Sequence, residues 1–121
     1  MSARQLLQRQ WSGYSAAHQN KTNLLFHIVA VPLFMVATVS ALYALVRLSF
    51  FAVVLSVLCF MVSLIMQGRG HAFEPLRPEP FRGSLDFACR IFAEQWITFP
   101  RFVLTGGWFK NIAHDFQGDT N

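Results

Sequence analysis

Two long apolar runs, residues 28–46 and 48–66, dominate the pattern of hydrophobic and polar positions, and a single charge, Arg47, separates them. Each run contains 19 residues without a charged side chain. At about 1.5 Å per residue, a helix of this length spans roughly 28 Å, close to the roughly 30 Å hydrocarbon core of a bilayer. The pattern predicts a transmembrane hairpin, with helices over residues 24–46 and 48–66. Pro32 either bends the first helix or lies in its first turn.

The segments on either side of the hairpin are more polar. Residues 3–17 place Leu7, Trp11 and Tyr14 along one side, which predicts an amphipathic helix on the membrane surface. Residues 67–83 contain three glycines and three prolines, a composition that predicts a loop. Loops set on rigid elements commonly carry functional residues, so we expect this loop to do so.

The C-terminal part returns to a helical pattern. Over residues 84–113 we expect interfacial or partly embedded helices. Asp86, Arg90 and Glu94 follow one another at i, i+4 and i+8, and we interpret them as a row of charges on one helix face rather than as metal ligands. Together the elements predict an all-α integral membrane protein with a single domain over residues 1–121.

Composition supports a membrane protein. Hydrophobic residues make up 54% of the chain and charged residues 13%, against roughly 25% charged residues in ordinary soluble domains. A chain of 121 residues is too small to cover two helices that are apolar on every side. The net charge is +4, but basic residues are scattered singly, which argues against a nucleic-acid partner. The two isolated cysteines form no disulfide framework.

Basic residues flank the hairpin, and only Arg47 lies in its turn. The positive-inside rule then predicts that both termini are cytoplasmic. The membrane would be the bacterial inner membrane or, in a eukaryote, that of the endoplasmic reticulum. The pattern is also compatible with a homo-oligomer.

Three of the four histidines flank the hairpin. His18 and His27 precede the first span and His71 follows the second, so two crossings return all three to one membrane surface. Imidazoles that converge with a carboxylate and leave coordination positions open suit a non-haem Fe(II) site, with Zn as the runner-up. Asn23 lies four residues before His27 on the same helix face and is a candidate to orient its ring.

Other polar residues are further candidates. Glu74 follows His71 by three residues and joins the ligands if the two share a helical turn. His114, near the polar C-terminus, is the remaining histidine and a possible ligand. Arg69 and Arg77 are candidates to bind lipid phosphates, or a substrate carboxylate beside the metal.

Two stretches resemble the motifs of a known family. They are His18-Gln-Asn-Lys-Thr-Asn-Leu-Leu-Phe-His27 with Val31-Pro32, and Gly70-His-Ala-Phe-Glu74 with Arg77-Pro78. In this order around an apolar hairpin, they resemble the Mpo1-like proteins, the group of domain of unknown function 962. His114-Asp115 resembles a His-Asp pair near the end of the yeast member. In two places the chain departs from the pattern: Lys21 replaces a proline, and Glu74 lies one residue nearer to His71.

The resemblance implies an Fe(II)-dependent dioxygenase of fatty acid α-oxidation, which uses O2 to convert a 2-hydroxy fatty acid to CO2 and the acid one carbon shorter. It also implies that His18, His27, His71 and His114 are ligands and that the carboxylate and hydroxyl of the substrate chelate the iron. The acyl tail is then expected between the spans or in adjacent membrane lipid. The alternative is a non-enzymatic membrane hairpin, such as an assembly factor or small subunit, in which the histidines are incidental.

Overall fold

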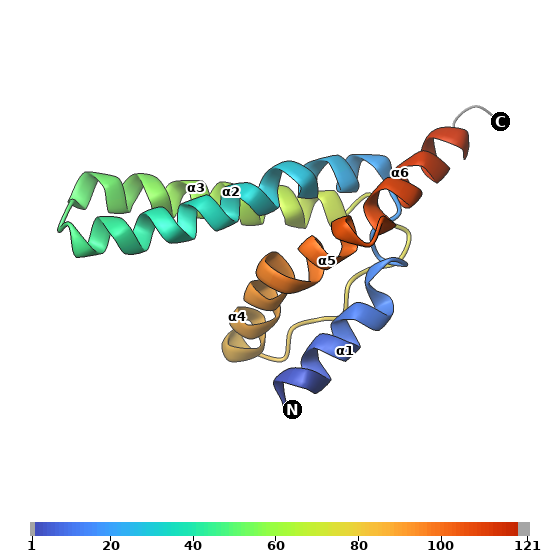
Figure 1. Cartoon of the computed structure of the whole chain (residues 1–121), viewed down its shortest axis with the longest axis horizontal. Coiled ribbons are helices and arrows are strands. Elements are labelled where there is room, and N and C mark those ends of the chain that lie inside the picture. The colour runs from blue at the N-terminus through green and yellow to red at the C-terminus, as the bar shows by residue number, and fades with distance from the viewer. Residues whose placement is uncertain (1, 119–121) are drawn as a thin grey trace.

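The fold is all-α, as the sequence predicts. The computed structural model describes residues 2–118, and these contain helices and no strand. In chain order the elements are α1 (Ala3–Tyr14), α2 (Lys21–Val46), α3 (Phe50–His71), α4 (Ser84–Ala93), the π-helical turn η1 (Glu94–Thr98), α5 (Phe99–Leu104) and α6 (Gly107–Gly118). Helices α2 and α3 lie side by side as a hairpin that projects beyond the other helices, which gather around its open end (Figure 1).

Local signals in the sequence set the ends of the hairpin helices. The side chain of Asn20 caps α2 by accepting hydrogen bonds from the backbone N–H groups of Thr22 and Asn23. From there α2 continues through Pro32, so the proline does not begin this helix. The reversal follows at Arg47, with Leu48 in the left-handed region at a φ of 54°, and Ser49 caps α3.

Both hairpin helices are long enough and apolar enough to cross a membrane. Their most apolar windows are only 28% and 17% buried within the protein, whereas a core helix of a soluble protein is mostly buried. Val46 and Phe50, on either side of the turn, are 80% and 83% exposed. This apolar surface lacks a cover within the described part of the chain, as expected of helices that face lipid.

Helix α3 extends beyond the predicted span. It ends at His71 rather than Met66, so the first five residues of the predicted loop are helical. Gly70 permits this extension because α2 and α3 meet closely there: a Cβ on Gly70 would lie 2.4 Å from Asn23 Oδ1. His71 is therefore held on a packed helix, and the connecting loop begins after it.

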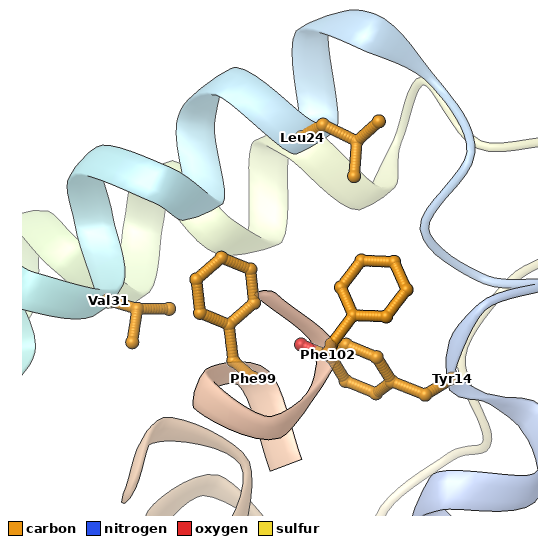
Figure 2. Packing of buried hydrophobic residues seen from close by; sticks show 5 residues of the cluster. All are labelled: Tyr14, Leu24, Val31, Phe99 and Phe102. Carbon is orange, nitrogen blue, oxygen red and sulfur yellow. The ribbon is translucent and has the colours of Figure 1, made fainter. Parts of the chain in front are cut away.

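A small apolar core attaches the C-terminal helices to the base of the hairpin. Leu24 and Val31 of α2 face Phe99 and Phe102 of α5, and Tyr14 joins them from the end of α1 (Figure 2). All five side chains are at most 4% exposed. Hydrophobic burial at this junction fixes the position of the segments that carry the polar site described below.

The π-helical turn lies directly before Pro100. A proline lacks the N–H group that would bond to the carbonyl four residues earlier. The chain stays helical instead, with the N–H of Phe99 bonded to the carbonyl of Glu94, five residues back. Single π-helical turns of this kind are frequent at functional sites.

Candidate metal centre

Three imidazoles from separate parts of the chain meet at the base of the hairpin. His18 lies in the turn after α1, His27 on α2 and His71 at the end of α3. The ring centroids are 4.8 Å apart for His18 and His27, 4.7 Å for His18 and His71, and 4.9 Å for His27 and His71. The convergence predicted from two membrane crossings is thus present in the structure.

The backbone sets the tautomers of two of these rings. His18 Nδ1 lies 2.8 Å from the carbonyl of Tyr14, and His27 Nδ1 lies 3.0 Å from the carbonyl of Asn23. A carbonyl can only accept, so each Nδ1 carries the hydrogen and each Nε2 keeps its lone pair. These two Nε2 atoms and Nδ1 of His71 are buried without a hydrogen-bond partner. Buried nitrogens in this state are suited to bind a metal.

Glu94, the first residue of η1, completes the group. Its Oε2 lies 3.5 Å from His18 Nε2 and 4.0 Å from His27 Nε2. One ligand atom from each of the four residues, His18, His27, His71 and Glu94, lies within 4.8 Å of the others. A set of three imidazoles and one carboxylate around a common point fits a divalent first-row metal.

The Tyr14 hydroxyl and two imidazoles surround the Glu94 carboxyl. Burial by itself raises the pKa of Glu94, but the neighbouring imidazoles of His18 and His27 and the hydrogen bond from the Tyr14 hydroxyl act in the opposite direction and lower it. Burial and the charge of Glu94 raise the pKa of Tyr14 well above its usual value of 10. Tyr14 is therefore a neutral donor to the carboxyl of Glu94.

Sequence reasoning did not place Glu94 beside the histidines. Asp86 and Arg90 do pair, at 3.3 Å, but Glu94, the expected third member of their row, faces the histidines. One signal was available, because a single carboxylate between Phe92 and Trp96 is costly to bury in an apolar helix unless it has a specific partner.

Glu74 lies outside the four-residue group, and its hydrogen bonds hold the backbone next to His18. Its Oε1 accepts hydrogen bonds from the backbone N–H groups of Gln19 and Asn20 and from the Asn23 side chain, at 2.7 to 3.0 Å. This contact ties the loop after α3 to the turn that carries His18. Asn23 orients His27 through its backbone carbonyl rather than its side chain.

The other predicted site residues lie away from the group. His114 is exposed on α6, and its neighbour Asp115 accepts a 2.8 Å hydrogen bond from the backbone N–H of Lys21 at the start of α2. Arg69 and Arg77 are exposed, and neither lines the cleft that leads to the histidines.

That cleft has a volume of about 600 Å³ and lies between α1, the base of α3, α4 and the loop before α4. His18, His71 and Glu94 form part of its wall. The arginines that line it are Arg9, Arg82 and Arg90, and all three are engaged with Glu79 or Asp86.

A family model described as 2-hydroxy-palmitic acid dioxygenase Mpo1-like matches residues 4–105. The match includes His18, His27, His71 and Glu94, and it ends before His114. No curated protein and no solved structure matches the chain.

Proposed function

Because the chain belongs to the Mpo1-like family, we propose that it is an Fe(II)-dependent dioxygenase that shortens 2-hydroxy fatty acids by one carbon. The observation that carries the proposal is the set of four ligand atoms, from His18, His27, His71 and Glu94, within 4.8 Å of one another. A purely structural role leaves the orphaned imidazole nitrogens unexplained, since buried polar atoms normally have partners.

The reaction balances without a further co-substrate. R-CHOH-COOH and O2 give R-COOH, CO2 and water, and the hydroxy acid supplies the four electrons that O2 accepts. Bound Fe(II) would supply a chelation point for the hydroxy acid and the means to activate O2. Zn(II), the runner-up for such ligands, does not undergo redox change, which favours iron for this chemistry.

The residues of the chain have three tasks in this proposal. His18, His27, His71 and Glu94 hold the iron. The carbonyls of Tyr14 and Asn23 keep the Nδ1 hydrogens of His18 and His27, so that both Nε2 lone pairs face the site. The Tyr14 hydroxyl fixes the carboxylate of Glu94.

We further propose that α2 and α3 span a membrane with both termini on its cytoplasmic side. An amphiphilic substrate has its polar head at the lipid–water boundary, and the histidines lie at the end of the hairpin where that boundary would be. Uncovered apolar faces on both helices support this placement.

The test is metal analysis and turnover with the full chain in detergent. Protein reconstituted anaerobically with Fe(II) should bind iron stoichiometrically and, with O2, convert 2-hydroxypalmitic acid to pentadecanoic acid. His71→Ala should lose both iron and turnover. His114→Ala, at the exposed histidine, is the matched control and should keep both.

Folded protein that takes up no iron, or iron-loaded protein that leaves the hydroxy acid unchanged, would contradict the proposal. The first result would favour the non-enzymatic hairpin, and exclusive binding of zinc would indicate a different reaction class.

A further inference from the structure

The cleft beside the metal centre has a definite course. At one end lie His18, His71 and Glu94. From there it follows α1 back towards its start, where Leu6 lines it, and the eight residue steps from Leu6 to Tyr14 cover about 12 Å of helix. Helix α4 forms the facing wall. In Figure 1 the two helices flank the loop that leads into α4.

The walls away from the metal centre are mostly aliphatic and aromatic. The apolar residues that line the cleft are Leu6, Leu64, Phe81, Leu85, Phe87 and Ile91. The charged groups on its wall are paired with one another, Arg9 and Arg82 with Glu79, and Arg90 with Asp86. What the cleft leaves for a ligand is therefore an apolar channel with metal-binding groups at one end.

Two glycines line this cleft at positions where no neighbouring atom excludes a larger side chain. Gly13 of α1 and Gly68 of α3 line it, and a Cβ added to either would meet no atom within 4 Å. By contrast, a Cβ at Gly70 or Gly107 would lie 2.4 or 2.5 Å from a neighbouring side chain. Glycine inside a helix destabilises it relative to alanine. What Gly13 and Gly68 provide is width in the cleft.

Near the histidines, side chains fill the space between the two long helices, and a second cleft between these helices lies nearer their turn, lined by residues within 33–59 and not by the histidines. Phe34 of α2 is fully buried, and its ring lies 4.6 Å from that of Phe60 on α3. Below them, Ser63 donates a hydrogen bond to the carbonyl of Ala30. An aliphatic chain that starts at the histidines therefore finds no room between the spans at this level. The space between the spans was one of two places, with adjacent lipid, where the family resemblance led us to expect the tail.

We propose that the cleft between α1, α3 and α4 holds the aliphatic tail of the hydroxy acid, and that Gly13 and Gly68 set its width next to the metal centre. The head group lies at His18, His71 and Glu94, and the tail leads away from the hairpin towards Leu6 and Leu85. This inference rests on the proposed function for the identity of the head group.

The test is photolabelling, which does not depend on turnover. The probe is 2-hydroxypalmitic acid with a diazirine in the middle of its tail, applied to the iron-loaded full chain without O2. We expect labelled peptides from residues 4–14 and 81–91. Gly13→Leu fills the cleft with an aliphatic side chain. The added side chain should prevent about two methylene groups of the probe's tail from being buried. The resulting loss of affinity should reduce labelling by about tenfold.

Ser12→Leu is the matched control, because Ser12 is the exposed neighbour of Gly13 and does not line the cleft. It should label as the unmodified chain does, and both variants should bind iron equally.

Labels within residues 33–60, or equal labelling of the two variants, would overturn the inference. Turnover of 2-hydroxypalmitic acid without labels in the cleft would overturn it and leave the proposed function standing. Labels in the cleft without turnover would support it and contradict the dioxygenase.

Discussion

The hydroxyl of Tyr14 donates a 2.8 Å hydrogen bond to Oε2 of Glu94, a residue 80 positions away in the chain. The same tyrosine ring stacks on His18, with 3.8 Å between the centroids. One side chain from α1 thus fixes both an imidazole and the carboxylate of the candidate metal centre. This link explains why α1, which contacts the hairpin little, matters for the site.

Replacing Tyr14 by phenylalanine keeps the ring and removes the donor. Because a partner that orients a ligand typically accounts for about 10–100-fold in metal affinity, we expect Fe(II) to bind more weakly by about that factor. Anaerobic iron titration measures the change. Tyr43→Phe, at an exposed position on α2, is the control, and equal affinities in the two variants would refute the role of Tyr14.

Replacing Glu94 by glutamine keeps the size and the acceptor for Tyr14 but removes the charge. If Glu94 binds the metal, iron affinity falls by more than the roughly 10–100-fold expected for loss of an outer partner. Asp86→Asn changes a carboxylate on the same cleft wall, and iron content should stay unchanged. If Glu94→Gln binds iron with full affinity, the three histidines hold the metal without Glu94.

Replacing Glu74 by alanine tests whether this residue braces the fold or binds the metal. The change leaves the buried side-chain amide of Asn23 and the partly buried N–H groups of Gln19 and Asn20 without their acceptor, which should lower the free energy of unfolding by about 1–3 kcal/mol. Glu79→Ala breaks an exposed ion pair with Arg9, worth about 0–1 kcal/mol. Thermal unfolding compares the two, and saturating iron should still fill Glu74→Ala. Loss of iron at saturation would make Glu74 a ligand.

Two glycines on α3 should respond in opposite ways to alanine. Gly70→Ala forces a Cβ to within 2.4 Å of Asn23 Oδ1, so it should separate α2 from α3 and lower the melting temperature. Gly68→Ala meets no neighbour and should stabilise the helix by about 0.5–1 kcal/mol. The same direction of change in both variants would argue against the close approach at Gly70.

Metal removal should destabilise the folded protein. The four candidate ligands come from four segments that meet only in the folded state, so a metal that binds them selects that state. At a free iron concentration 100 times Kd, binding contributes about 2.7 kcal/mol. Thermal unfolding with iron and with a chelator measures this difference. The stabilisation by iron should disappear in His71→Ala and persist in His114→Ala. If His71→Ala is still stabilised by iron, the metal binds at another site.

The sequence by itself determined the hairpin. Uninterrupted apolar runs of bilayer length separated by Arg47 specify two long helices, because helix rise and membrane thickness are fixed quantities. Since a helical hairpin returns the chain to its starting end, the meeting of His18 and His27 with His71 follows from the same pattern. These inferences depend only on local periodicity and chain direction.

Only the tertiary structure decided which polar residues share the site. Glu94 lies with the three imidazoles, His114 is exposed on α6, and Glu74 Oε1 accepts hydrogen bonds from the turn that carries His18. The position of each depends on how α4, η1 and α5 pack on α2 through Phe99 and Phe102. Packing between segments distant in sequence is set by side-chain shape and burial, which helical periodicity does not encode.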